Sequence, residues 1–175
     1  MRDRRGLLIV YTGNGKGKTT AALGAALRAV GQGFKVLMIQ FLKGSWHYGE
    51  LDSARLLGED FELRPMGRGF VNPRQPRPED MQLVEEAWEA ARKAMASDEY
   101  DLLILDEINY AVHFGMIPVE RVLKDLARRP QRLHVICTGR AAHEKLIEAA
   151  DLVSEMVEIK HPFQEGIQAA LGIDY

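Results

Sequence analysis

The sequence has very little cysteine and no long apolar segment. Cys137 is the only cysteine among 175 residues, so an intramolecular disulfide is excluded and a reducing compartment is favoured. Cys137 lies in the apolar run LHVICTG, which indicates a small buried strand residue rather than a nucleophile. No apolar segment reaches the roughly 20 residues that a membrane-spanning helix requires, and the first residues, MRDRRG, lack the apolar stretch of a secretion signal. We therefore expect a cytoplasmic protein with no membrane partner.

An excess of positive charge is also absent. Lysine and arginine total 23 and aspartate and glutamate total 25, so the net charge is −2. This balance gives no general attraction to nucleic acid, and a nucleic-acid partner is disfavoured. The composition, 46% hydrophobic and 27% charged, is ordinary for a soluble enzyme. The length fits one domain over residues 1–175.

Short apolar runs alternate with amphipathic segments of helical period. The β-rich runs cover 6–12, 35–42, 61–67, 101–107, 132–139 and 152–160, and helices are predicted over 18–30, within 43–58, from 78, over 118–128 and over 141–150. In the helix from 78, Trp88 shares the helical spacing of its apolar neighbours and is expected in the core. The alternation predicts an α/β fold with a mainly parallel sheet of five or six strands between helices.

The stretch Tyr11–Thr20, YTGNGKGKTT, lies between a predicted strand and a predicted helix and ends like a phosphate-binding loop. The usual G-x-x-x-x-G-K-[ST] pattern has its first glycine where this chain has Thr12. Backbone N–H groups near the loop glycines and the helix N-terminus can bind oxyanions. Lys16 and Lys18 would neutralise phosphate charge, and the Thr19 hydroxyl would bind Mg²⁺. The pattern therefore predicts a polyphosphate site.

Two acids follow the apolar run LLIL and complete this interpretation. Asp106 and Glu107 would lie at the end of a buried strand, where a carboxylate can hold Mg²⁺ directly or through water. These motifs do not identify which bond of the bound polyphosphate compound breaks. Cradled phosphates are equally compatible with γ-phosphoryl transfer, hydrolysis and departure of the whole triphosphate.

Other polar residues give weaker signals. The five histidines lack metal-ligand spacing. Arg140 follows a predicted strand at the edge where α/β folds bind ligands, so it is expected to clamp a phosphate or to pair with an acid, and we favour the clamp. The irregular segment 64–78 holds four prolines and four arginines. We interpret it as a binding loop or lid rather than a connector, since Phe70 and Val71 are apolar enough to contact a ligand.

Several longer strings are typical of one group of enzymes. They are YTGNGKGKTTAALGAALRAVG, VLMIQFLKGSW with GE after it, LLILDEINYA, CTGR, ADLVSEM, IKHPF and GIDY, and they cover nearly the whole chain. On these strings the chain resembles the P-loop corrinoid adenosyltransferases. The resemblance implies a RecA-like P-loop domain that transfers the 5′-deoxyadenosyl group of ATP to the cobalt(I) of a corrinoid and releases triphosphate. The corrinoids of the family are cobalamin, cobinamide and cobyrinic acid a,c-diamide, in adenosylcobalamin biosynthesis or salvage.

The resemblance also implies roles for individual residues. By the resemblance, ATP is expected to lie along the loop in the direction opposite to that usual in P-loop proteins, with Mg²⁺ on Thr19 and Glu107. Lys16, Lys18 and Glu107 form the predicted catalytic set, and Phe70 is expected to contact the corrinoid. The predicted ATP-binding residues are Thr12, Gly13, Asn14, Gly15, Lys16, Gly17, Lys18, Thr19, Thr20, Arg28 and Arg140. A homodimer and a flavodoxin-like reductant are implied as partners.

Two differences from relatives bear on corrinoid binding. Some relatives have tryptophan where this chain has Asn72, and some carry a longer amino-terminal segment that covers the corrinoid. By the resemblance we expect looser corrinoid binding here or a contribution from a neighbouring subunit. The competing hypotheses are a RecA-like ATPase or nucleoside kinase, which would cleave the γ-phosphate, and a corrinoid-delivery module, which would leave ATP unchanged.

Overall fold

The central element is a six-stranded parallel sheet. The computed structural model describes residues 5–44, 46–69 and 76–174. The strands are β1 (Leu8–Thr12), β2 (Val36–Gln40), β3 (Phe61–Pro65), β4 (Leu102–Asp106), β5 (His134–Thr138) and β6 (Leu152–Glu155). Their order in the sheet is β3-β2-β4-β5-β1-β6, and each recorded pairing is parallel. The predicted α/β fold with a mainly parallel sheet is confirmed.

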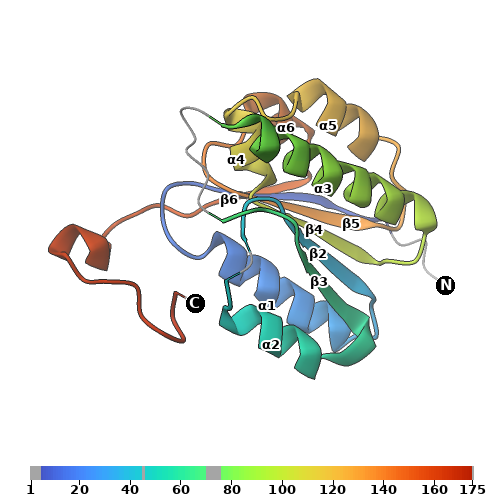
Figure 1. Cartoon of the computed structure of the whole chain (residues 1–175). Coiled ribbons are helices and arrows are strands. Elements are labelled where there is room, and N and C mark those ends of the chain that lie inside the picture. Colours follow the sequence, from blue (N-terminus) through green and yellow to red (C-terminus); the bar gives the residue numbers. More distant parts are fainter. Residues whose placement is uncertain (1–4, 45, 70–75, 175) are drawn as a thin grey trace.

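Helices cover both faces of this sheet. They are α1 (Lys18–Val30), α2 (Gly49–Leu56), α3 (Pro78–Ser97), α4 (Ile108–His113), α5 (Val119–Leu126) and α6 (Glu144–Ala149), with short 3₁₀ helices η1 (Gly58–Asp60) and η2 (Pro162–Glu165). Figure 1 shows α1 and α2 on one face and α3 to α6 on the other. Within the described ranges, no helix is both long and apolar enough to cross a membrane.

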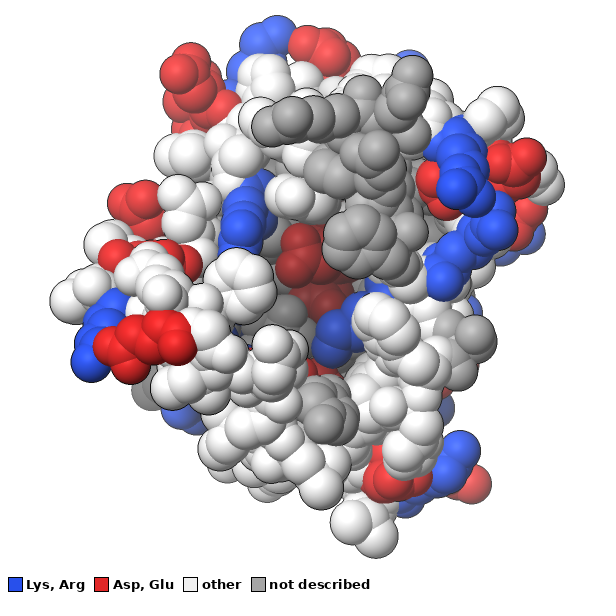
Figure 2. All heavy atoms as spheres, turned by 60° about the vertical axis from the view of Figure 1, so that its left-hand side comes forward, with Lys and Arg blue, Asp and Glu red and all other residues white. Residues whose placement is uncertain are grey.

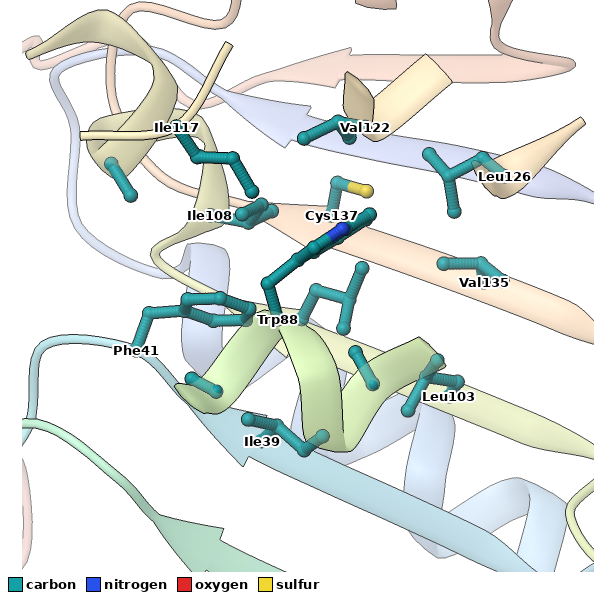
Figure 3. Close-up of a cluster of buried hydrophobic side chains, with 14 of the residues drawn as sticks. Ile39, Phe41, Trp88, Leu103, Ile108, Ile117, Val122, Leu126, Val135 and Cys137 are labelled. Atoms are coloured by element: carbon teal, nitrogen blue, oxygen red, sulfur yellow. The ribbon is translucent and has the colours of Figure 1, made fainter. Parts of the chain in front are cut away.

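The two-sided covering explains why the central strands carry apolar residues on both faces. In β2, Leu37 and Ile39 pack into the core under α3, whereas Val36 and Met38 pack into the core under α1 and α2. Trp88 of α3 is completely buried in the larger core, and Figure 3 shows it between Phe41 and Cys137. Its indole Nε1 donates to Asp125 Oδ2 over 3.0 Å, which satisfies the buried donor. The predicted core positions of Trp88 and Cys137 are confirmed.

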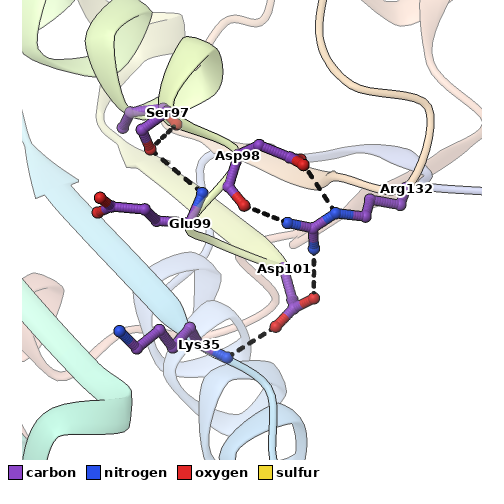
Figure 4. Close-up of polar contacts among 7 residues, drawn as sticks. Lys35, Ser97, Asp98, Glu99, Asp101 and Arg132 are labelled. Carbon is purple, nitrogen blue, oxygen red and sulfur yellow. Dashed lines mark hydrogen bonds and ion pairs between the residues drawn. The ribbon is translucent and has the colours of Figure 1, made fainter.

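A polar cluster fixes the amino-terminal edge of the sheet, opposite the edge where ligands bind in such folds. Arg132 donates to Asp101 Oδ1 over 2.6 Å and to Asp98 Oδ1 over 3.0 Å. Asp101 Oδ2 accepts from the backbone N–H of Lys35 over 2.9 Å. These contacts, shown in Figure 4, join the chain segments that lead into β2, β4 and β5. They hold the starts of three strands in a common register.

The secondary structure differs from the prediction at three places. α4 was not predicted, because its six residues are too few to give a helical hydrophobic period. The predicted helix over 141–150 is reduced to α6. The predicted strand over 152–160 ends at Glu155. The chain then continues as an extended tail with η2, which Figure 1 shows reaching away from the sheet and returning toward the start of α1.

Candidate nucleotide-binding site

Four neighbouring strands end in a buried polar residue at the carboxyl edge of the sheet. Thr12 ends β1, Gln40 ends β2, Asp106 ends β4 and Thr138 ends β5. Each side chain is at most 9% exposed. In parallel α/β sheets ligands bind outside the carboxyl ends of the strands. The polar ends therefore place the candidate site above the centre of the sheet.

The loop from Gly13 to Gly17 connects β1 to α1 beside these strand ends. Gly13 has a φ of 96°, a conformation that side-chain-bearing residues rarely adopt. Lys18 at the start of α1 is buried, and its Nζ donates to the carbonyls of Gly13 and Gly15, each over 2.7 Å. The backbone N–H of Gly15 donates to the carbonyl of Met156 over 2.7 Å. The loop is thus closed around the Lys18 ammonium.

Asp106 is the centre of a buried hydrogen-bond network. Its Oδ1 accepts from the hydroxyl of Thr19 over 2.9 Å and from that of Thr138 over 2.7 Å. Its Oδ2 accepts from the Gln40 amide over 3.3 Å, and the Gln40 Oε1 accepts from the hydroxyl of Tyr48. The Asp106 carboxylate therefore fixes the direction of the Thr19 hydroxyl at the head of α1.

Glu107 follows Asp106 and turns its side chain into the site. It directly precedes α4 and has a left-handed conformation with a φ of 66°. Its backbone N–H donates to Thr138 Oγ1 over 3.0 Å. Burial and then the charge of Asp106 raise the pKa of Glu107 to about 7, against the opposite effects of Lys18 and Arg140. The site therefore holds a carboxylate that is costly to charge when no cation is bound.

Lys18 experiences the complementary effect. Burial lowers the pKa of Lys18, Glu107 and Asp106 raise it, and Arg140 lowers it further. Two cationic and two acidic side chains thus act on one another across a small space. Figure 2 shows acidic and basic side chains together in a hollow on this face of the molecule.

A cavity of about 840 Å³ opens above these groups. Of the predicted ATP-binding residues, Gly15, Lys16, Gly17, Lys18, Thr19, Thr20 and Arg140 line it, together with Glu107. The fold thus brings together the two halves of the predicted polyphosphate site, which lie 87 residues apart at Thr19 and Asp106. The volume is large enough for a nucleotide.

Four predicted ATP-binding residues do not line this cavity. Thr12 is nearly buried, and its hydroxyl accepts from the backbone N–H of Ala142 over 3.1 Å, which ties β1 to the segment after β5. Gly13 turns the chain, and Asn14 is exposed outside the cavity. Arg28 lies in the last turn of α1, at the end away from the loop. Phe70, predicted to contact the corrinoid, lies outside the described residues.

The carboxyl-terminal tail closes one side of the cavity. His161, Gly172, Ile173 and Asp174 line it. Asp174 Oδ1 lies 2.6 Å from the Nζ of Lys16, and the hydrogen bond from Lys16 lowers the pKa of Asp174. The Asp174 carboxylate is therefore paired with Lys16, one of the cations in the loop that is predicted to bind phosphate.

Comparison with known sequences decides the family. Residues 4–175 match the family described as "ATP:corrinoid adenosyltransferase BtuR/CobO/CobP". This chain belongs to that family. The corrinoid adenosyltransferase of Escherichia coli K12 is 44% identical over 99% of this chain and 88% of its own length. The corresponding figures are 42%, 99% and 86% for the relative in Pseudomonas aeruginosa, and 41%, 99% and 88% for "Corrinoid adenosyltransferase CobA" of Salmonella typhimurium.

Two solved structures of more distant proteins have folds similar to that of this adenosyltransferase family member. The RadB recombinase aligns with a TM-score of 0.52 at 17% identity, over 91% of this chain and 78% of its own. The flagellar accessory protein FlaH of Methanocaldococcus jannaschii aligns with a TM-score of 0.60 at 15% identity, over 87% of this chain and 71% of its own. These likenesses support the predicted RecA-like P-loop fold and carry no information on activity.

The oxygen ligands present fit a magnesium ion. The Thr19 hydroxyl donates its proton to Asp106, so its lone pairs remain for a cation, and the Glu107 carboxylate lines the same cavity. Among the described residues no group of three or more His, Cys, Asp or Glu side chains could hold a metal ion. Mg²⁺ usually takes one or two protein ligands and completes its shell with water and substrate phosphate. The site fits that pattern.

The sequence prediction missed Gln40, Tyr48 and Thr138. Thr138 is the polar residue that ends an apolar run, which is the signal that identified Asp106, and the same signal would have found it. Gln40 is followed by Phe41 and Leu42, so the sequence does not mark it as the end of a strand. Tyr48 has no such signal, because its place under Gln40 depends on the chain between β2 and α2.

Proposed function

We propose that the chain transfers the 5′-deoxyadenosyl group of ATP to the cobalt(I) of a corrinoid and releases triphosphate. The observation that carries the proposal is that, in a member of this family, the phosphate loop and Glu107 line one cavity, and Asp106 is hydrogen-bonded to Thr19 on its wall. The cobalt(I) electron pair attacks C5′, a cobalt–carbon bond forms, and the C5′–O bond breaks. The bonding pair leaves with triphosphate, which gains negative charge.

The residues of the chain act on the leaving group and not on the nucleophile. Lys18 and Lys16 hold the triphosphate and stabilise the charge that develops as the C5′–O bond breaks. Glu107 and Thr19 would hold Mg²⁺, which when bound supplies further neutralisation of the triphosphate charge. A cobalt nucleophile needs no general base, and the site accordingly relies on positioning and electrostatics.

The decisive experiment supplies the purified protein with ATP, Mg²⁺ and chemically reduced cob(I)alamin. We expect the spectrum of adenosylcobalamin to appear together with one intact triphosphate for each corrinoid converted. Formation of orthophosphate without a cobalt–carbon product would support the ATPase or kinase hypothesis instead. If the protein binds ATP and corrinoid but leaves both unchanged during an incubation long enough for many turnovers, the result would support the delivery module.

The ion pair between Lys16 and Asp174 gives a prediction for ATP binding. ATP must compete with Asp174 for Lys16, so Asp174→Asn should raise the affinity for ATP about two- to fivefold, the range of an exposed ion pair. Titration calorimetry without corrinoid measures the effect. Glu165→Gln is the matched control, because Glu165 pairs with Lys160 within the same tail, 3.0 Å away, and does not line the cavity. Unchanged or weaker binding by Asp174→Asn would refute the competition.

Further features are proposed on the family resemblance alone. They are a homodimer, a cytoplasmic location, a flavodoxin-like electron donor and the contact of Phe70 with the corrinoid. The roles of Arg28 and Arg140 toward ATP have the same standing, although Arg140 is supported by its place on the cavity wall.

A further inference from the structure

Thr138 contacts both acidic residues at the end of β4. Its hydroxyl donates to Asp106 Oδ1 over 2.7 Å and accepts from the backbone N–H of Glu107 over 3.0 Å. A hydroxyl carries one proton and two lone pairs, so one side chain can make both bonds at once. Thr138 is completely buried, which keeps water from replacing either bond. Thr138 thus holds both the Asp106 side chain and the backbone N–H of Glu107 at the end of β4.

The end of β5 also shapes the space in which the Glu107 side chain lies. Glu107 has a φ of 66°, which is uncommon for a residue other than glycine. A Cβ atom on Gly139 would lie 3.1 Å from Glu107 Oε2, so the carboxylate lies against the bare backbone of this glycine. Thr138 therefore fixes the backbone of Glu107, and Gly139 leaves room for its side chain.

Asp106 passes the effect of Thr138 on to α1. Its Oδ1 is shared by the hydroxyls of Thr138 and Thr19. Loss of the Thr138 hydroxyl would leave Thr19 as the only one of these two donors on that oxygen and would free the carboxylate to turn. Its other oxygen is held separately, by Gln40 and through it by Tyr48.

We propose that Thr138 is the positioning residue of the cation site, since it fixes the Thr19 hydroxyl through Asp106 and the Glu107 carboxylate through its backbone. The inference rests on the proposed function in one respect, the assignment of Mg²⁺ to Thr19 and Glu107. Thr138 does not line the cavity and is not a ligand itself. Substitution of Thr138 should therefore change the affinity of the site for the cation and not the affinity of the loop for phosphate.

Three variants test this division. Thr138→Val removes the hydroxyl and nearly keeps the shape, Thr138→Ser keeps the hydroxyl, and Tyr48→Phe removes another buried hydroxyl of the same network that touches neither acid. Mn²⁺ affinity of the ATP complex is measured by electron paramagnetic resonance, and ATP affinity in excess chelator by calorimetry. Thermal unfolding of each variant checks that it is folded.

We expect Thr138→Val to weaken Mn²⁺ binding about 10- to 100-fold, as loss of a partner behind a metal ligand usually does, and to leave chelator-measured ATP affinity unchanged. Thr138→Ser should retain Mn²⁺ affinity, and Tyr48→Phe should lose less than Thr138→Val. Equal losses in Thr138→Val and Tyr48→Phe, or equal losses of ATP affinity with and without cation, would overturn the inference. So would an unaltered protein whose ATP complex binds no Mn²⁺, whereas adenosylcobalamin formation by that protein judges the proposed function separately.

Discussion

Replacing Lys18 with alanine is expected to lower the rate of adenosyl transfer by about 100- to 1000-fold, the usual effect of removing a group that stabilises developing negative charge. Lys18 is a buried cation at the head of α1, enclosed by the loop carbonyls of Gly13 and Gly15. On the proposed function its charge would stabilise the departing triphosphate, and a charge acts more strongly in a buried site than in water. The measurement is the initial rate of adenosylcobalamin formation at saturating ATP.

The same replacement also removes two hydrogen bonds that close the loop. Lys18→Met tests this second effect, because it keeps the length of the side chain without the charge. Both variants should be slow if charge is decisive, and thermal unfolding checks that each is folded. Lys93→Ala is the control for loss of a lysine, since Lys93 is exposed in the carboxyl-terminal half of α3. A Lys18→Ala protein that keeps most of its activity would contradict the assigned role.

Glu107→Gln is expected to stabilise the metal-free protein at pH 8. It should also reduce Mg²⁺-dependent activity by about 100-fold or more, because loss of a metal ligand should lower activity at least as much as loss of a residue that orients a ligand. The pKa of Glu107 is raised to about 7 in the folded chain, by burial and by Asp106, from an ordinary value of 4.5. Below pH 4.5 the group is neutral in both states. As pH rises from 4.5 through 7 the unfolded chain loses this proton first, so the folded state loses stability.

Chemical denaturation in the presence of a chelator measures the free energy of unfolding of the metal-free protein. At pH 8 the glutamine variant should be more stable by up to about 3 kcal/mol, from the size of the pKa change. The difference should shrink toward pH 4.5. Glu86→Gln is the matched control, because Glu86 is exposed on α3. A glutamine variant that is less stable than the parent at pH 8 would show that Glu107 is held by interactions stronger than its burial.

Local patterns predicted those parts of the site whose signal lies within a few residues. The loop from Gly13 to Lys18 and the pair Asp106 and Glu107 each stand beside a strand of continuous apolar residues, and the order of strand, loop and helix fixed their place. The parallel sheet followed from strands that are apolar on both faces, as in β2, because helices on both sides of a sheet bury such strands.

Contacts between distant segments were not predictable in this way. Thr138 reaches Asp106 across 32 residues, and Asp174 reaches Lys16 from the far end of the chain. Both depend on which strands become neighbours and on the course of the tail after β6, and neither leaves a periodic trace in the sequence. Arg28, assigned to ATP by the resemblance alone, is near the loop in sequence, but the rise of α1 carries it to the other end of the helix.

The buried position of Cys137 has a practical consequence for the chemistry proposed. Cobalt(I) persists only with a strong reductant, and the same reagents attack disulfides, while the alkylating agents that trap cobalt(I) also attack free thiols. The single thiol of this chain is completely enclosed under Trp88, and burial raises its pKa to about 12, so it stays protonated and unreactive. The cysteine of this chain therefore does not compete with cobalt(I) for alkylating agents, and the chain has no disulfide for the reductant to attack.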